Sequence, residues 1–83
     1  MAATYKINQI KRGDEGNDVL LLQEILKARG IYKGGLDRKF GPATEKAVID
    51  YQDIRIKSGA NLGRADGIVG PKTWNDILAL SKI

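Results

Sequence analysis

Hydrophobic residues along the chain fall into three clusters that have the spacing of helices. In the first cluster, a spacing of three and four residues puts the apolar side chains on one stripe: Val19, Leu22 and Leu26. Asn17 or Asp18 stands before this stripe and can cap the first turn. Gly30 stands behind it, where a glycine in the left-handed conformation commonly ends a helix. These signals predict a helix over residues 18–29.

Proline marks the start of two further helices. Its missing N–H would be unpaired at the first helical position anyway, so we expect helices to begin at Pro42 and Pro71. Apolar residues continue into both: Ala47, Val48 and Tyr51, then Ile77 and Leu78. Residues 1–10 show only weak alternation, and we expect an extended or single-turn segment that packs across a domain formed by residues 11–83. The pattern predicts an all-α fold, a compact three-helix bundle.

One phrase occurs twice, 29 residues apart, directly before the second and third helices. "DRKFGPAT" begins at Asp37 and "DGIVGPKT" begins at Asp66, and both keep the Asp, the Gly-Pro and the Thr. The glycine takes the N-cap position, where it offers no side-chain acceptor to the free amides of the first turn. We therefore expect each carboxylate to accept hydrogen bonds from loop amides and from the hydroxyl of Thr44 or Thr73. The sequence thus predicts two pseudo-repeated loop–helix units.

Composition narrows the range of functions. The 83 residues form one domain, with 14 basic and 10 acidic residues, a net charge of +4, and neither cysteine nor histidine. Basic residues occur in runs of two at most, whereas nucleic-acid-binding arms usually cluster theirs. Without histidine or cysteine the usual zinc ligands and the usual base for nucleophilic catalysis are missing, so we expect no metal and no cofactor. The amino end has no signal-peptide pattern, and no stretch approaches the ~20 apolar residues of a membrane span.

Three short strings follow one another in order: "V..LQ..L...G" from Val19, "D..FG..T..AV..YQ" from Asp37 and "DGIVG.KTW..IL" from Asp66. In this order they resemble the peptidoglycan-binding domain of bacterial and phage cell-wall hydrolases, over about residues 11–80. The resemblance implies a three-helix module without catalytic activity that holds an attached wall hydrolase, such as an endolysin, on its substrate. We further expect a monomer that acts at the cell envelope or outside the cell and binds the stem peptide and glycan of peptidoglycan.

Two features depart from the family pattern. The family usually has Asp-Gly in both loops, but here Arg38 follows Asp37. If that position needs a positive φ, the arginine is strained by about 1 kcal/mol. The loop from Gln52 to Asp66 is also longer than usual, which can change what binds beside it.

We expect the ligand to bind in a shallow groove formed by the start of the second helix, the loop before it and the long loop before the third helix. Aromatic faces stack on sugars, and arginine binds carboxylates in bidentate fashion. The candidates for ligand contact are Tyr32, Arg38, Tyr51, Arg55, Arg64 and Trp74. Tyr32, in a glycine-rich loop, is expected to be the most exposed aromatic residue. The competing explanations are core packing for Tyr51 and Trp74 and a solvated surface for the arginines.

Other functions remain open at this point. Asp37 and Asp66 could form a catalytic carboxylate pair, but so small a bundle has little room for the cleft that such a pair needs, and catalysis leaves the repeated Gly-Pro-Thr unexplained. Leu20 and Leu21 lie off the main stripe and could dock a partner protein. A small nucleic-acid binder that uses the net charge is the remaining alternative. Finally, we expect two glutamines at the edge of the core to bond loop backbone: Gln23 and Gln52.

Overall fold

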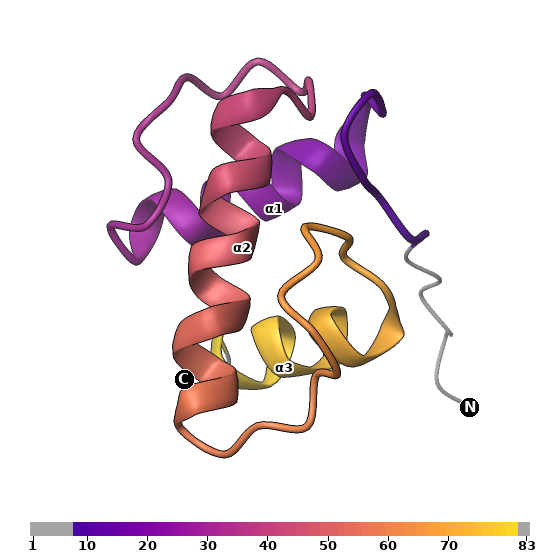
Figure 1. Ribbon diagram of the computed structural model, residues 1–83. Coiled ribbons are helices and arrows are strands. Elements are labelled where there is room, and N and C mark those ends of the chain that lie inside the picture. Colours follow the sequence, from indigo (N-terminus) through magenta and orange to yellow (C-terminus); the bar gives the residue numbers. More distant parts are fainter. Residues whose placement is uncertain (1–7, 82–83) are drawn as a thin grey trace, which may run out of the picture.

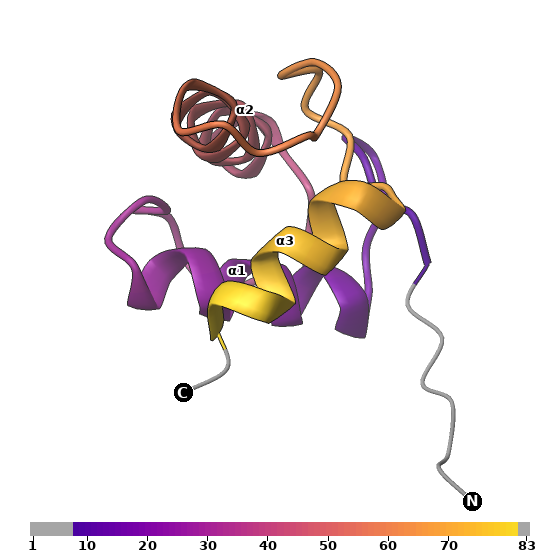
Figure 2. The same ribbon diagram turned by 90° about the horizontal axis from the view of Figure 1, so that it is seen from below.

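The computed structural model describes residues 8–81, which form three helices joined by two long loops (Figure 1). The helices are α1 (Asn17–Ala28), α2 (Pro42–Lys57) and α3 (Pro71–Ser81). Figures 1 and 2 show α2 lying across α1 and α3, which form a layer on one side of it. The predicted all-α, three-helix fold is confirmed, as are the starts of α2 and α3 at proline. Within the described part of the chain, no helix is both long and apolar enough to cross a membrane.

Helices α1 and α2 end in the same way, with a glycine in the left-handed conformation. Gly30 has φ 77° and Gly59 has φ 102°. At the end of α1, the amide of Ile31 donates to the carbonyl of Leu26 at 2.9 Å, and Ala60 makes the equivalent bond at the end of α2. Such bonds satisfy carbonyls that have no partner inside the helix. The expected role of Gly30 is confirmed, and the same ending recurs 29 residues later.

The start of α1 differs from the prediction. Gly16, with φ 129°, is the N-cap, and no side chain caps the first turn. The Asp18 carboxylate instead accepts a hydrogen bond from the amide of Asn8 at 3.2 Å. The prediction that Asn17 or Asp18 caps this helix is therefore wrong, because the carboxylate is taken up by the segment that precedes α1.

That preceding segment connects the two loops. Ile10 and Val69 exchange two backbone hydrogen bonds, of 3.1 and 2.9 Å, just before α3. A few residues later, the amide of Phe40 donates to the carbonyl of Asp14 at 2.9 Å, just before α2. The segment thus runs past the starts of both helices. The rest of the predicted extended segment, residues 1–7, lies outside the described residues.

The core gathers equivalent positions of the three helices. Val19, Val48 and Ile77 stand 29 residues apart and are fully buried. Around them pack the other buried apolar side chains: Ile10, Leu22, Leu26, Tyr32, Phe40, Ala47, Tyr51, Leu62, Val69 and Trp74. The loops supply several of these residues, so the loops are part of the core and hold a defined position on the helices.

Candidate functional site

A buried glutamine of α1 holds the first loop against the start of α2. The amide nitrogen of Gln23 lies 3.1 Å from the Asp37 carboxylate, 3.1 Å from the Thr44 hydroxyl and 3.0 Å from the Lys39 carbonyl. Its carbonyl oxygen accepts the amide of Arg38 at 3.1 Å. We call Gln23, Asp37 and Thr44 the first glutamine cluster.

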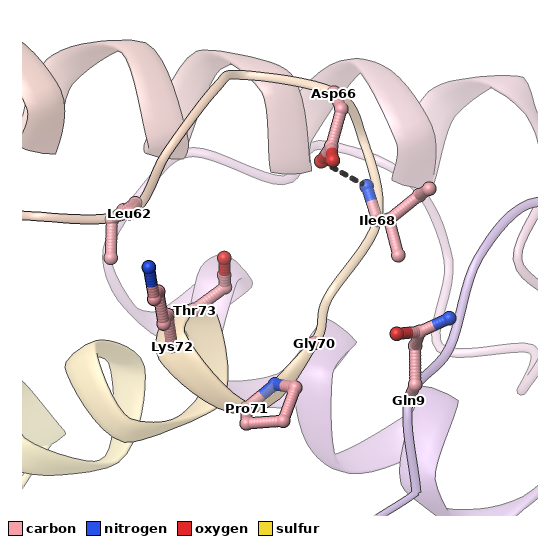
Figure 3. A pocket seen from close by; sticks show the side chains of 8 residues that line it. All are labelled: Gln9, Leu62, Asp66, Ile68, Gly70, Pro71, Lys72 and Thr73. Carbon is pink, nitrogen blue, oxygen red and sulfur yellow. Dashed lines mark hydrogen bonds between the residues drawn. The ribbon is translucent and has the colours of Figure 1, made fainter.

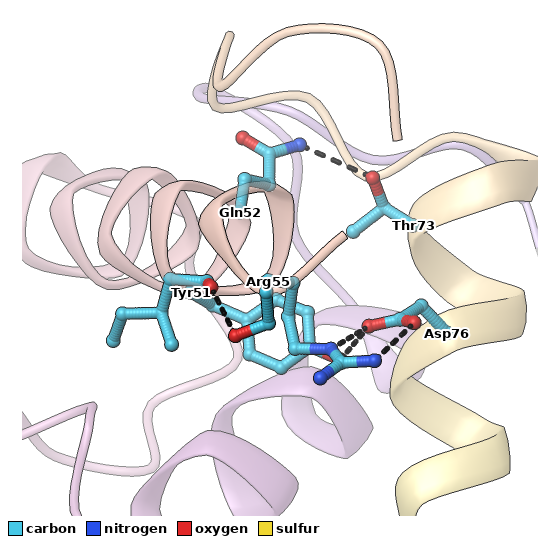
Figure 4. A network of polar contacts seen from close by, with 7 residues as sticks. Tyr51, Gln52, Arg55, Thr73 and Asp76 are labelled. Carbon is cyan, nitrogen blue, oxygen red and sulfur yellow. Dashed lines mark hydrogen bonds and ion pairs between the residues drawn. The ribbon is translucent and has the colours of Figure 1, made fainter. Parts of the chain in front are cut away.

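The same arrangement recurs 29 residues later between α2 and the start of α3. The amide nitrogen of Gln52 lies 3.2 Å from the Thr73 hydroxyl (Figure 4). It also lies 3.3 Å from the Asp66 carboxylate and 2.9 Å from the Ile68 carbonyl. Its carbonyl oxygen accepts the amide of Gly67 at 2.9 Å. Gln52, Asp66 and Thr73 form the second glutamine cluster. Both loops are therefore positioned by the same side chains in the same places.

The aspartates bond loop amides as expected, but they do not bond the threonine hydroxyls directly. Each accepts a loop amide, from Lys39 at 3.0 Å for Asp37 and from Ile68 at 2.9 Å for Asp66. The glutamine amide, however, stands where we expected a direct bond between carboxylate and threonine hydroxyl. The Lys39 amide and then the Gln23 side chain lower the pKa of Asp37, because both donate to its charged form.

Arg38 stands where the family usually has glycine, and it adopts the left-handed conformation. Its φ is 66°, close to the 78° of Gly67, which occupies the equivalent place in the second loop. A side chain is disfavoured in this region of φ, whereas glycine is not. The glutamine cluster therefore imposes this backbone shape on both loops, and only the second loop has the residue that suits it.

A groove lies between the long loop and α3. One hollow of about 400 Å³ at the start of α3 is lined by Gln9, Leu62, Asp66, Ile68, Gly70, Pro71, Lys72 and Thr73 (Figure 3). A second, of about 410 Å³, continues along α3 and is lined by Arg55, Ala60, Asn61, Leu62, Lys72, Asn75, Asp76 and Ala79. Leu62 and Lys72 line both hollows, and we call the two together the α3 groove. Buried Leu62 and Thr73 contribute to its floor, and exposed Lys72, Asn61 and Asn75 to its rim.

A charged pair closes the far end of the α3 groove. The Arg55 guanidinium donates from Nε to Asp76 at 2.8 Å and from a terminal nitrogen at 3.2 Å, and the Tyr51 hydroxyl donates to the same carboxylate (Figure 4). The hydrogen bond from Arg55 is the main reason why the pKa of Asp76 is lowered, and the same bond raises the pKa of Arg55. Burial raises the pKa of Tyr51, so this hydroxyl stays protonated and remains a donor.

We expect this pair to make stability depend on pH in the acid range. Because the folded-state pKa of Asp76 lies below its usual value of 3.8, its contribution is complete above that value and is lost as the pH falls through the folded-state pKa. The Tm should therefore fall more steeply between pH 4 and pH 2 in the parent than in Asp76→Asn. A parallel decline in the two proteins, measured by circular dichroism, would contradict this assignment.

The structure separates the six predicted ligand residues. Tyr32, Tyr51 and Trp74 are 4%, 2% and 3% exposed, so their rings pack in the core. The expectation that Tyr32 is the most exposed aromatic residue is wrong, because its hydroxyl donates to the Gly35 carbonyl and the loop folds over the ring.

The three arginines lie in different places. Arg55 lines the α3 groove, Arg64 is exposed in the long loop, and Arg38 is exposed in the first loop. The start of α2, where we expected the groove, carries a smaller hollow of about 290 Å³.

Sequence reasoning did not single out several groove residues. Asn61 and Asn75 have no periodicity or motif that distinguishes them from other polar surface residues, and Lys72 stands in the third family string without being marked there as a ligand contact. The burial of Leu62 could have been predicted from the sequence. An isolated leucine in an otherwise polar loop indicates that the loop contacts the core. Among residues 8–81, no group of three or more His, Cys, Asp or Glu side chains is placed to hold a metal ion.

Known proteins are similar to this chain over most of its length. The sequence pattern of the peptidoglycan binding domain family matches residues 15–77, which include both glutamine clusters and most of the α3 groove. The chain is 38% identical over 73 residues to the spore cortex-lytic enzyme of Bacillus subtilis (strain 168), covering 88% of this chain and 22% of that protein. The Bacillus cereus spore cortex-lytic enzyme is 37% identical, with 88% and 26% covered. The chain thus spans about a quarter or less of these relatives.

Three solved structures have the same fold. The SleB N-terminal domain superposes with a TM-score of 0.79 at 34% identity, covering 95% of this chain and all of that one. A peptidoglycan-binding protein from Clostridioides difficile, in complex with glutamine hydroxamate, gives 0.75 at 37% identity, with 90% and 43% covered. A Burkholderia AP3 phage endolysin gives 0.69 at 40% identity, with 87% and 25% covered.

Proposed function

Because this chain belongs to the peptidoglycan-binding domain family, we propose that it binds peptidoglycan in the α3 groove, without catalysing a reaction on it. The α3 groove carries this proposal: it is a continuous depression with a partly apolar floor and a polar rim, made by a loop that the second glutamine cluster holds in place. Small-ligand sites commonly combine an apolar floor with a few placed polar groups.

The lining chemistry suits a ligand that is part sugar and part peptide. Leu62 and Pro71 offer apolar surface to the ring of a sugar or to a short side chain. Asn61 and Asn75 offer amides that can both donate to and accept from hydroxyl and acetamido groups. Lys72 supplies an exposed cation for a stem-peptide carboxylate.

Arg55 contributes in another way. Two of its N–H groups are taken by Asp76, so the pair fixes the orientation of the guanidinium and leaves its other N–H groups for a ligand. Side chains held in this way lose little freedom on binding, which favours affinity.

We further propose that the module works as a monomer at the cell envelope or outside the cell, attached to or associated with a wall hydrolase. The curated relatives are named as cortex-lytic enzymes, and the chain matches about a quarter or less of their length. Binding to a polymer with many sites raises the effective concentration of an attached enzyme at its substrate, even where each contact is weak.

The double variant Lys72→Ala, Asn75→Ala tests the assignment of the groove. We expect the parent to co-sediment with purified insoluble cell walls and the variant to bind about tenfold more weakly, a loss of about 1.4 kcal/mol. Both side chains are exposed, so the melting temperature should change little.

Lys46→Ala is the matched control, since Lys46 is an exposed lysine on α2 outside the groove. Wall binding by the double variant at the level of this control would exclude the α3 groove as the site. If the parent protein stays in the supernatant, the proposed function is excluded. Binding to nucleic acid that declines steeply with salt would instead support the nucleic-acid-binding alternative.

A further inference from the structure

The two loops share one scaffold, which allows them to be compared position by position. The glutamine clusters, the left-handed residue at their centre and the proline that opens each following helix all recur at an interval of 29 residues. Arg38 therefore corresponds to Gly67, and Lys39 to Ile68. Both pairs use their backbones in the same way, since Arg38 and Gly67 donate to the glutamine while Lys39 and Ile68 donate to the aspartate.

The side chains at these equivalent positions differ in kind. In the second loop, Leu62 and Ile68 line the α3 groove with apolar surface. In the first loop, the corresponding residues are the exposed Lys33 and Lys39. With Arg38, the first loop carries three cations at places where the second has two apolar residues and a glycine. Around the glutamine clusters, the same backbone thus presents the cations Arg38 and Lys39 in one copy and Gly67 and Ile68 in the other.

Neither Arg38 nor Lys39 forms an ion pair within the described part of the chain, although the charge of Lys39 contributes to lowering the pKa of Asp37. The ion pairs found within residues 8–81 take up Arg12, Lys46, Arg55 and Lys57. Lys39 also lines the hollow at the start of α2 and is exposed there. Of the two acids in that hollow, Asp14 is engaged by the amide of Lys11 at 3.0 Å.

Arg38 also occupies a backbone conformation that is unfavourable for a residue with a side chain. At φ 66° a glycine is the favoured residue, and no described contact of the arginine side chain offsets the strain. We propose that residues 33–39 form a second contact site, which binds an anionic group of the wall polymer through Arg38 and Lys39. The inference rests on the proposed function, because it takes the same polymer as the ligand.

One ligand can reach both sites. Ile10 pairs with Val69 before α3, and Asp14, four positions further along the chain, pairs with Phe40 before α2. The chain between them spans at most about 14 Å, so the starts of α2 and α3 lie within reach of a polymer fragment of a few units. Two linked contacts on one polymer strengthen each other without any new interaction at either.

The test compares Arg38→Gly and Lys39→Gln in co-sedimentation with purified cell walls, alongside thermal melting. We expect each variant to bind about threefold to fivefold more weakly at low salt and the difference to shrink at high salt, as for exposed charge contacts. Arg38→Gly should at the same time melt at a higher temperature than the parent, because the strain is relieved, while Lys39→Gln should melt unchanged. A gain in stability with a loss of binding separates a ligand contact from a structural role.

Lys57→Gln is the control for net charge, since Lys57 lies at the opposite end of α2, about 22 Å from its start. Walls stripped of phosphate polymers distinguish the two sources of the anion: a loss that persists on them indicates stem-peptide carboxylates, and one that disappears indicates phosphate. If Arg38→Gly and Lys39→Gln bind like Lys57→Gln while the groove variant is impaired, the second site is excluded and the proposed function stands. If the parent does not bind walls at all, both fail.

Discussion

Gln52→Ala is expected to lower the free energy of unfolding by about 3–5 kcal/mol. The side chain is 1% exposed, and its amide holds the Ile68 carbonyl and the Gly67 amide. Truncation leaves both groups without that partner and opens a cavity between α2 and the loop. A domain of this size is stable by roughly 4–12 kcal/mol, so the variant should lose a large share of its stability.

Chemical denaturation measures this effect directly, and Gln9→Ala is its control. Gln9 is an exposed glutamine, and its truncation should stay within about 0.5 kcal/mol of the parent. Should Gln52→Ala unfold at nearly the same denaturant concentration as Gln9→Ala, the second glutamine cluster does not hold the loop. Gln23→Ala is expected to follow Gln52→Ala, because the first cluster repeats its bonds.

Trp74→Ala is expected to destabilise the fold by about 3–5 kcal/mol, since it removes the largest side chain of the core. The ring is 3% exposed, and its N–H donates to the carbonyl of Asn8 at 3.0 Å. That bond fastens the segment before α1 onto α3. The same substitution would have little effect on stability if Trp74 were a surface residue used for stacking on sugar.

Trp74→Phe separates the structural role of this residue from ligand contact. It keeps most of the buried surface but removes the bond to Asn8, so we expect a loss of about 1 kcal/mol in stability and unchanged wall binding. Wall affinity that drops in Trp74→Phe, with melting close to that of the parent, would restore Trp74 to the ligand site.

The same loops carry the proposed binding surfaces and the buried hydrogen bonds that stabilise the fold. The second glutamine cluster holds Asp66 and Ile68, which line the α3 groove, and the first holds Arg38 and Lys39. The proposed binding surfaces are therefore carried on loops that are packed like core elements. This arrangement allows the first loop to carry a strained arginine, because the surrounding bonds determine the backbone whatever side chain it bears.

Much of the fold could be derived from local signals. Pro42 and Pro71 marked the starts of α2 and α3, and Gly30 marked the end of α1, because proline and glycine restrict or permit φ regardless of distant contacts. The repeated Asp, Gly-Pro and Thr correctly indicated two equivalent loop–helix units. The family resemblance, carried by the same residues, agrees with the comparisons.

The tertiary structure alone decided which atoms meet. Gln23 and Gln52 were expected to bond backbone, but their place between carboxylate and hydroxyl depends on how α1 and α2 approach the loops. Tyr32 is buried rather than exposed for the same reason. The amino-acid sequence by itself determined the helices, their ends and the repeat, since these follow from the backbone preferences of neighbouring residues. The α3 groove arises from residues far apart in the chain, and their distances are set only when the core packs.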